Sequence, residues 1–242
     1  MRIEVARDEF ALAEQAANII AATVREWPDA VLALPTGNTP IGTYAALRQR
    51  VADGELDLSR ATVVAIDEFV GVTRATPGTN SCYYRDHLDL RLRALRVPDP
   101  AAENPEREIR SFAESVRAGG GITLCVLGVG ANGHIAFNEP GSAADSRARV
   151  VELQRSTREA HAADFGSFEA VPDRAMTLGV ADLLEARAIL VLASGIEKAD
   201  IVARALEGPM TADVPASFLQ SHADVTFLLD RAASASLSRR AS

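Results

Sequence analysis

LCVLGVGANGHIAFNEPG, at residues 124–141, is the stretch of sequence that decides the fold. It begins with an apolar run long enough for a buried strand, which glycines then interrupt. Polar side chains follow the glycines directly: Asn132, His134, Asn138 and Glu139. Ligands bind outside the carboxyl ends of the strands in open α/β sheets. The stretch therefore predicts a parallel strand with chemistry at its carboxyl end, and it favours an enzyme.

Short apolar runs alternate with segments of helical periodicity along the whole chain, a pattern typical of βαβ units around a parallel sheet. The apolar runs predict strands at residues 30–34, 62–66, 122–127, 188–192 and 225–229, with a short edge strand at 3–5. The periodic segments predict helices at residues 9–25, 41–52, 82–90, 105–118, 183–186 and 198–206. We expect a three-layer, Rossmann-like α/β fold with a mostly parallel central sheet. It forms one domain over residues 1–242, with a frayed tail from about residue 232.

The composition excludes several classes of protein. The chain has 242 residues and a formal net charge of −8, which argues against a nucleic-acid partner because neutralising phosphates requires a basic patch. No apolar run approaches the length that spans a membrane, and the N-terminus is too charged for a signal peptide. The two cysteines, Cys82 and Cys125, lack metal-ligand spacing and favour reduced thiols over a disulfide. We expect a cytoplasmic protein.

The loop at residues 35–40 follows the first buried strand and leads into a helix. Its small residues suit a phosphate cradle, in which the backbone amides of Gly37 and Asn38 and the hydroxyls of Thr36 and Thr39 face phosphate oxygens. The alternative is an ordinary turn in which Thr39 caps the helix, and this segment alone favours the ordinary turn. The loop matches neither the Walker pattern nor Gly-x-Gly-x-x-Gly.

Two adjacent carboxylates, Asp67 and Glu68, follow the next strand. Successive side chains at a strand end point to opposite faces, so one carboxylate enters the crevice while the other caps or meets solvent. A carboxylate in a dry pocket has a raised proton affinity and can act as a general base near neutral pH. Asp67, the first off the strand, is the better candidate. An aspartate that only organises the following turn is the alternative.

His134 and Glu139 are five residues apart, a spacing that a tight turn can bring together. A carboxylate hydrogen-bonded to an imidazole fixes its tautomer and keeps it available for proton transfer. A purely structural histidine is the minor alternative, because an asparagine, a glutamate and several glycines surround His134.

Lys198 is the only lysine among the 25 basic residues. It stands where the fourth strand turns into a helix, and an ammonium there is unfavourable beside the positive end of the helix dipole. A bound phosphate would relieve this conflict, which favours a binding role over chance survival of one lysine.

Four segments together, at residues 35–40, 67–71, 128–141 and 194–198, resemble the glucosamine-6-phosphate deaminase family. The similarity extends from about Val31 to His222, and the third segment is the most specific. The related 6-phosphogluconolactonases share the fold and a Gly-x-Gly-x-Asp-Gly-His stretch, but they continue differently from IAFNEP at residues 135–140. This continuation favours the deaminases.

The resemblance implies that glucosamine 6-phosphate and water become fructose 6-phosphate and ammonia, without a metal or an organic cofactor. His134, held by Glu139, would open the sugar ring, and Asp67 would carry a proton from C2 to C1. The implied phosphate site consists of Thr36, Gly37, Asn38, Thr39 and Lys198. Galactosamine 6-phosphate as substrate, lactonase activity and a catalytically silent sugar-phosphate-binding domain remain the alternatives.

The chain departs from the family pattern at two site positions. Asn132 replaces an aspartate of many members; because asparagine cannot accept a proton, we expect His134 to depend more on Glu139. Ala163 stands where many members have an arginine that grips the phosphate, and Arg158 and His161 are the candidates to replace it, unless the substrate differs.

Allosteric members of the family bind N-acetylglucosamine 6-phosphate between subunits through basic residues downstream of the third segment. Arg149 is retained from that set, but Val151 and Glu152 stand where a basic residue and a small polar residue are expected. We predict no such activation, and a monomer or small homo-oligomer. Residues 142–173, which are polar and poorly periodic, are the expected lid.

Overall fold

The computed structural model describes residues 1–238, which form two β-sheets joined by helices. The larger sheet has seven strands in the order β1-β10-β9-β6-β2-β3-β5, and every strand pair in it is parallel. These strands are β1 (Arg2–Ala6), β2 (Val31–Leu34), β3 (Thr62–Ala65), β5 (Ala94–Arg96), β6 (Leu124–Gly128), β9 (Ala188–Ala193) and β10 (Val225–Asp230). The predicted three-layer α/β fold with a parallel central sheet is confirmed.

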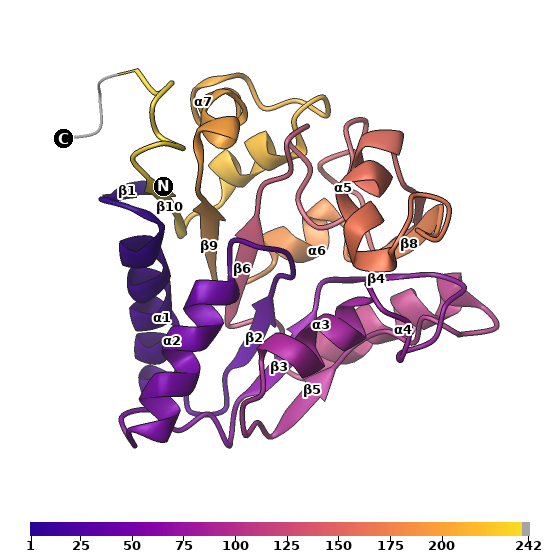
Figure 1. The fold of residues 1–242 in the computed structure, drawn as a ribbon, viewed down its shortest axis with the longest axis horizontal. Helices are drawn as coiled ribbons and strands as arrows, with labels where there is room; N and C mark the ends of the chain where they lie inside the picture. The colour runs from indigo at the N-terminus through magenta and orange to yellow at the C-terminus, as the bar shows by residue number, and fades with distance from the viewer. Residues whose placement is uncertain (239–242) are drawn as a thin grey trace.

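The strands are short and apolar because both faces of the sheet are covered by helices. Successive residues of β6 alternate between two hydrophobic clusters, with Leu124 and Val126 in one and Cys125 and Leu127 in the other. The first cluster includes side chains of α1 (Glu9–Glu26), α2 (Ile41–Ala52) and α3 (Asn80–His87). The second includes side chains of α4 (Pro105–Ala118), α6 (Val180–Leu184), α7 (Ala199–Glu207) and the 3-10 helix η2 (Pro215–Ser221). Figure 1 shows α1 and α2 side by side along one face.

The direction in which the chain builds the sheet reverses between β2 and β6. From β2 the chain continues through α2 to β3 and then to β5, whereas from β6 it continues in the opposite direction, to β9 and β10. Loops on the two sides of such a switch point diverge and leave room for a ligand at the carboxyl edge of the sheet. The loops that carry the predicted site residues all leave the sheet at this edge.

The smaller sheet is antiparallel and begins directly after β3. It has the order β4-β8-β7, formed by β4 (Asp67–Phe69), β8 (Arg174–Thr177) and β7 (Arg149–Glu152). Helix α5 (Arg155–Phe165) follows β7, and α5, β4 and β8 lie together in Figure 1. A third hydrophobic cluster, which contains Phe69 and Phe137, lies under this part of the chain.

The smaller sheet, α5 and β5 were not predicted. Strands of three or four residues carry too little periodicity to be recognised, and α5 buries only Thr157 fully. The segment expected to be a lid, residues 142–173, thus contains a strand and a helix. Most other boundaries shift by one to three residues: the helix expected at 82–90 is Asn80–His87, and Lys198 ends a 3-10 turn, η1 (Ile196–Lys198), before α7 begins.

The tail is anchored further along the chain than expected. Ala233 is buried and its N–H donates to Asp230, and the Ser236 hydroxyl donates to Asp200 on α7 at 2.7 Å. The tail expected to fray from residue 232 thus makes contacts with the domain, and its last residues, 239–242, lie outside the described part. Among residues 1–238, no helix combines the length and apolar character needed to cross a membrane.

Candidate active site

The loop between β2 and α2 presents a row of free backbone donors. Within the described residues, the N–H groups of Thr36, Gly37, Asn38 and Thr39 donate to no acceptor. Gly37 has a φ of +95°, and a Cβ there would meet nothing within 4 Å, so the backbone borders open space. Pro40 occupies the N-cap of α2 without any side-chain cap. Thr39 therefore does not cap the helix, contrary to the alternative considered for this loop.

Asp67 is the first residue of β4 and is buried, with 7% of its surface exposed. Burial raises the pKa of its carboxyl to about 7, the charge of Glu68 adds to this effect, and a hydrogen bond from Asn80 opposes it. The side chain is therefore close to half ionised at neutral pH, which suits a general base.

Glu68 has a different task from its neighbour. Its carboxylate is fully buried and accepts the N–H groups of Phe69, Asn80 and Ser81 and the Ser81 hydroxyl, at 2.9 to 3.0 Å. It thereby fixes the start of α3 against β4. Glu68 thus takes the capping role expected for one of the two carboxylates, while both carboxylates contact Asn80.

Asn80 links the two loops described above. Its Nδ2 donates to Oδ1 of Asp67 at 2.6 Å and to the Asp67 backbone carbonyl at 2.9 Å. Its Oδ1 accepts the hydroxyl of Thr36 at 3.1 Å. Sequence analysis missed Asn80, because its partners are 13 and 44 residues away along the chain.

His134 lies in the loop after β6, where Asn132 is inserted between it and Glu139. The ring Nδ1 is 2.8 Å from Oδ1 of Asn132 and 3.6 Å from Oε2 of Glu139, and Nδ2 of Asn132 donates to that Oε2 at 2.8 Å. An ionised carboxylate can only accept, so the amide of Asn132 must point its NH₂ group at Glu139 and its oxygen at His134. Nδ1 of His134 then carries the proton, and Nε2 keeps a free lone pair. Asn132 thus bridges His134 and Glu139, whose Nδ1 and Oε2 atoms are 3.6 Å apart.

Glu139 is held in its ionised form. Burial raises its pKa, but hydrogen bonding and charge from His134, together with the amide of Asn132, outweigh burial and lower the pKa to about 2. Its other oxygen accepts the N–H of Gln154 at 3.3 Å. Arg149 of β7 supports the same turn, since its guanidinium donates to Asn138 and to Ser142, each at 2.9 Å.

Gly130 is required by the packing of the imidazole. A Cβ at this position would lie 2.2 to 2.4 Å from ring atoms of His134, closer than real Cβ contacts. Any larger residue would therefore displace the ring. Gly128, two residues earlier, is different, because a Cβ there would meet nothing within 4 Å.

The Asp67 strand and the His134 loop meet at β8. Asp67 pairs with Thr177 in the antiparallel register, and the Thr177 hydroxyl accepts the N–H of Phe137 at 3.2 Å. The rings of Phe69 and Phe137 pack edge to face, 5.1 Å apart. The structure therefore joins the two predicted acid–base segments through a shared strand and a shared aromatic contact.

Lys198 approaches the same loop from β9. Its Nζ donates to the backbone carbonyl of Val129, next to Gly130, at 2.9 Å. Burial lowers the pKa of the ammonium, and Glu197 opposes this effect. Lys198 is also the N-cap residue of α7. Its ammonium is therefore attached at the positive end of the helix dipole, as predicted from the sequence. The solitary lysine thus lies between the ends of β6 and β9.

The two candidates to replace the missing arginine, Arg158 and His161, both lie on α5. Arg158 donates to the carbonyl of Val171 at 3.1 Å, and its guanidinium lies 4.4 Å from the centre of the Phe168 ring, so it holds the turn after α5. His161 packs edge-on against Phe69, and burial lowers its pKa below 6.5, which keeps it neutral at pH 7. Nε of Arg158 is buried without a hydrogen-bond partner among the described residues, so Arg158 stays the candidate cation of the two.

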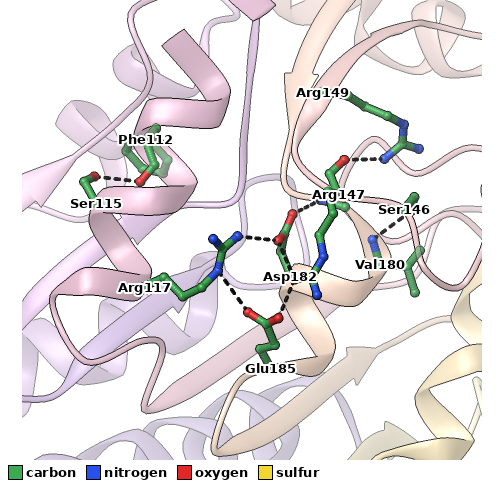
Figure 2. A network of polar contacts seen from close by, with 10 residues as sticks. Phe112, Ser115, Arg117, Ser146, Arg147, Arg149, Val180, Asp182 and Glu185 are labelled. Carbon is green, nitrogen blue, oxygen red and sulfur yellow. Dashed lines mark hydrogen bonds and ion pairs between the residues drawn. The ribbon is translucent and has the colours of Figure 1, made fainter. Parts of the chain in front are cut away.

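A cavity of about 290 Å³ lies away from these loops, between α4 and α6. Figure 2 shows the ion pairs beside it: Arg117 of α4 contacts Asp182 at 3.0 Å and Glu185 at 3.2 Å, and Arg147 contacts the same two carboxylates. Two cations balance two anions, so this network joins the helices and leaves no charge for a ligand. Among residues 1–238, no cluster of three or more His, Cys, Asp or Glu side chains could hold a metal ion.

Comparison with known proteins relates this geometry to one family. The family model described as glucosamine-6-phosphate isomerases/6-phosphogluconolactonase matches residues 7–228. A glucosamine-6-phosphate deaminase of Rhodopirellula baltica is 41% identical over all of this chain and 98% of its own. Glucosamine-6-phosphate deaminase 1 of Bacillus subtilis is 41% identical over 92% of this chain and 93% of its own.

The solved structures agree in fold. A monomeric glucosamine-6-phosphate deaminase superposes with a TM-score of 0.94 at 38% identity, covering 98% of this chain and all of the other. A 6-phosphogluconolactonase of Trypanosoma brucei has a TM-score of 0.77 at 22% identity, covering 98% of each chain, and shares the fold alone. The chain therefore belongs to the family of glucosamine-6-phosphate isomerases and 6-phosphogluconolactonases, and among these proteins it resembles the deaminases more than the lactonases.

Proposed function

We propose that the protein converts glucosamine 6-phosphate and water to fructose 6-phosphate and ammonia. The observation that carries the proposal is the buried Asp67, whose pKa is raised to about 7 and which Asn80 ties to the loop of free N–H groups. A base and an anion cradle are thus coupled in one network. The deaminase relatives, at about 41% identity, support the choice of substrate.

The substrate's phosphate binds at the carboxyl edge of the sheet. The N–H groups of residues 36–39 donate to its oxygens, together with the hydroxyl of Thr39, and the ammonium of Lys198 supplies the positive charge. Because Ala163 supplies no guanidinium, Arg158 is the candidate for a second cation at this site. Lys198 and the backbone carry phosphate recognition.

Ring opening uses the free lone pair of His134. Its Nε2 takes the proton of the C1 hydroxyl and returns a proton to the ring oxygen as the C1–O5 bond breaks. Asn132 accepts a hydrogen bond from the Nδ1–H group, and the ionised Glu139 orients Asn132, so both stabilise the imidazolium that forms transiently.

Isomerisation and deamination follow at Asp67. Its carboxylate takes the proton from C2 as the aldehyde oxygen O1 gains a proton, which gives an enolamine. The carboxyl then delivers the C2 proton to C1, and the amino group loses a proton that balances the one gained by O1. The product is a ketimine at C2, and water adds to its C=N bond and expels ammonia. Every atom of the two products then comes from glucosamine 6-phosphate and one water molecule. A pKa near 7 allows the carboxyl to act as base and then as acid.

A coupled assay tests the proposal. Purified protein with glucosamine 6-phosphate should yield fructose 6-phosphate and ammonia in equal amounts, and Asp67→Asn should abolish both. Asp29→Asn is the matched control, because Asp29 is exposed and pairs only with Arg60. Turnover of galactosamine 6-phosphate alone, of 6-phosphogluconolactone alone, or binding without turnover would each contradict the proposal and support one of the alternatives.

We also propose that the protein acts as a monomer, without activation by N-acetylglucosamine 6-phosphate, in the cytoplasm. The similarity to a monomeric deaminase supports the first point, and the two free cysteines fit a reducing compartment. Light scattering after gel filtration should give the mass of a single chain. Activation by N-acetylglucosamine 6-phosphate would contradict the absence of regulation.

A further inference from the structure

All three tyrosines of the chain donate hydrogen bonds to the end of β2 or to the loop that follows it. The hydroxyl of Tyr84 donates to the carbonyl of Leu34, that of Tyr44 to the carbonyl of Pro35, and that of Tyr83 to the carbonyl of Gly37. Tyr44 comes from α2 and the other two from α3.

The three rings also pack on one another. Tyr83 contacts Tyr44 edge to face at 6.3 Å between ring centres, and it contacts Tyr84 in the same way at 6.0 Å. Tyr44 and Tyr84 are fully buried, and burial raises the pKa of all three hydroxyls above the usual range. The hydroxyls therefore stay protonated and remain donors across the working pH range. These residues form a rigid unit, the tyrosine clamp, defined as Tyr44, Tyr83 and Tyr84.

Peptide geometry converts these bonds into an orientation of the loop. The C=O of one residue and the N–H of the next point in opposite directions across a planar trans peptide. Fixing the carbonyls of Pro35 and Gly37 toward the α2–α3 layer therefore turns the N–H groups of Thr36 and Asn38 away from that layer. The hydrogen bond from Tyr84 to the Leu34 carbonyl orients no N–H group, because the next residue, Pro35, has no N–H.

We propose that the tyrosine clamp pre-organises the anion cradle, so that two of its N–H donors face the substrate's phosphate before binding. The free N–H groups of the loop and the absence of a side-chain cap on α2 agree with this role, since without the clamp the loop could turn carbonyl oxygens toward the anion. The clamp residues act through the backbone and are positioning residues, not catalytic ones. The inference rests on the proposed binding of a sugar phosphate at residues 36–39.

Tyr83→Phe tests the clamp, because it removes one hydroxyl and keeps the ring. Tyr83 is the least buried of the three, so the variant should fold, and a thermal melt checks this. Loss of one hydrogen bond should raise KM for glucosamine 6-phosphate about fivefold and leave kcat within about twofold. The inhibition constant for inorganic phosphate should rise by the same factor. Ser221→Ala is the matched control: its hydroxyl donates to the Phe218 carbonyl outside the site, and both constants should stay unchanged.

Calorimetric binding of inorganic phosphate separates the clamp from the proposed function, because it requires no turnover. Weaker phosphate binding by Tyr83→Phe supports the clamp even if the wild-type protein does not deaminate glucosamine 6-phosphate. Equal affinity of Tyr83→Phe and the wild type for phosphate overturns the proposed role of the clamp. A fall in kcat of Tyr83→Phe with KM unchanged also overturns it. Failure of the wild type to bind phosphate also overturns it. Tyr44→Phe provides a second variant with the same expected result.

Discussion

Asn80 offers the sharpest test of how the fold sets the chemistry of Asp67. Its side chain stabilises the ionised carboxylate through a hydrogen bond of 2.6 Å at a buried site. A hydrogen bond to a charged group contributes about 1.5 to 3 kcal/mol. Because water can fill part of the space in Asn80→Ala, the lower end applies, and about 1.4 kcal/mol corresponds to one pKa unit. The substitution should therefore raise the pKa of Asp67 from about 7 to about 8.

This change has a definite effect on the pH profile. The reaction requires ionised Asp67, so kcat/KM rises as pH passes through its pKa. At pH 7 the ionised fraction falls from about one half to about one tenth in Asn80→Ala, which lowers kcat/KM about fivefold. At pH 9 both proteins are mostly ionised at this carboxyl, and the difference should shrink to less than about twofold.

The assay is kcat/KM for glucosamine 6-phosphate measured from pH 5.5 to pH 9. Helix α3 should survive the substitution, because the hydroxyl of Thr79, rather than Asn80, caps it by accepting the Cys82 N–H. Asn104→Ala is the matched control: Asn104 also begins a helix but lies outside the site. An acidic limb that stays in place, or that moves to lower pH, would refute the reasoning that Asn80 controls the proton affinity of Asp67.

Three further substitutions follow from the site. Gly130→Ala forces a Cβ into the ring of His134 and should lower kcat by at least about 100-fold in a protein that still folds. The control, Gly128→Ala, should keep kcat within about twofold of the wild type, because its Cβ meets nothing within 4 Å. Equal kinetics of the two variants would contradict the packing argument. Lys198→Ala removes the site's ammonium and should raise KM for glucosamine 6-phosphate about 10- to 100-fold in steady-state kinetics; an unchanged KM would remove Lys198 from the phosphate site. The pKa of Glu139 is lowered to about 2 in the folded protein, so its ionised form stabilises the fold above its ordinary pKa of 4.5, and this stability is lost as pH falls toward 2. In urea unfolding, the free energy of unfolding of Glu139→Gln should be about 2 kcal/mol lower than that of the wild type at pH 7, a figure that allows for screening by solvent. This difference in unfolding free energy should narrow from pH 5 to pH 3. A difference that does not change with pH would exclude this linkage.

Some features of the molecule could be predicted from local sequence. Runs such as residues 124–127 are apolar because the strands are covered on both faces, and the periodic stripe of α1 reflects a helix packed on a sheet. Both signals lie within a few consecutive residues. The loops after β2, β3, β6 and β9 could be located for the same reason, since a parallel sheet places the ends of its strands at one edge.

The sequence by itself determined the parallel sheet, the edge at which the polar loops gather and the identity of Asp67, His134 and Lys198 as the groups to examine. Only the tertiary structure decided which groups touch: Asn80 on Asp67, Asn132 between His134 and Glu139, and the tyrosines on the loop after β2. The physical reason is how far apart along the chain the interacting residues lie. Hydrophobic periodicity is a property of neighbouring residues, whereas a hydrogen bond of 2.6 to 3.1 Å joins groups that only the packed chain brings together.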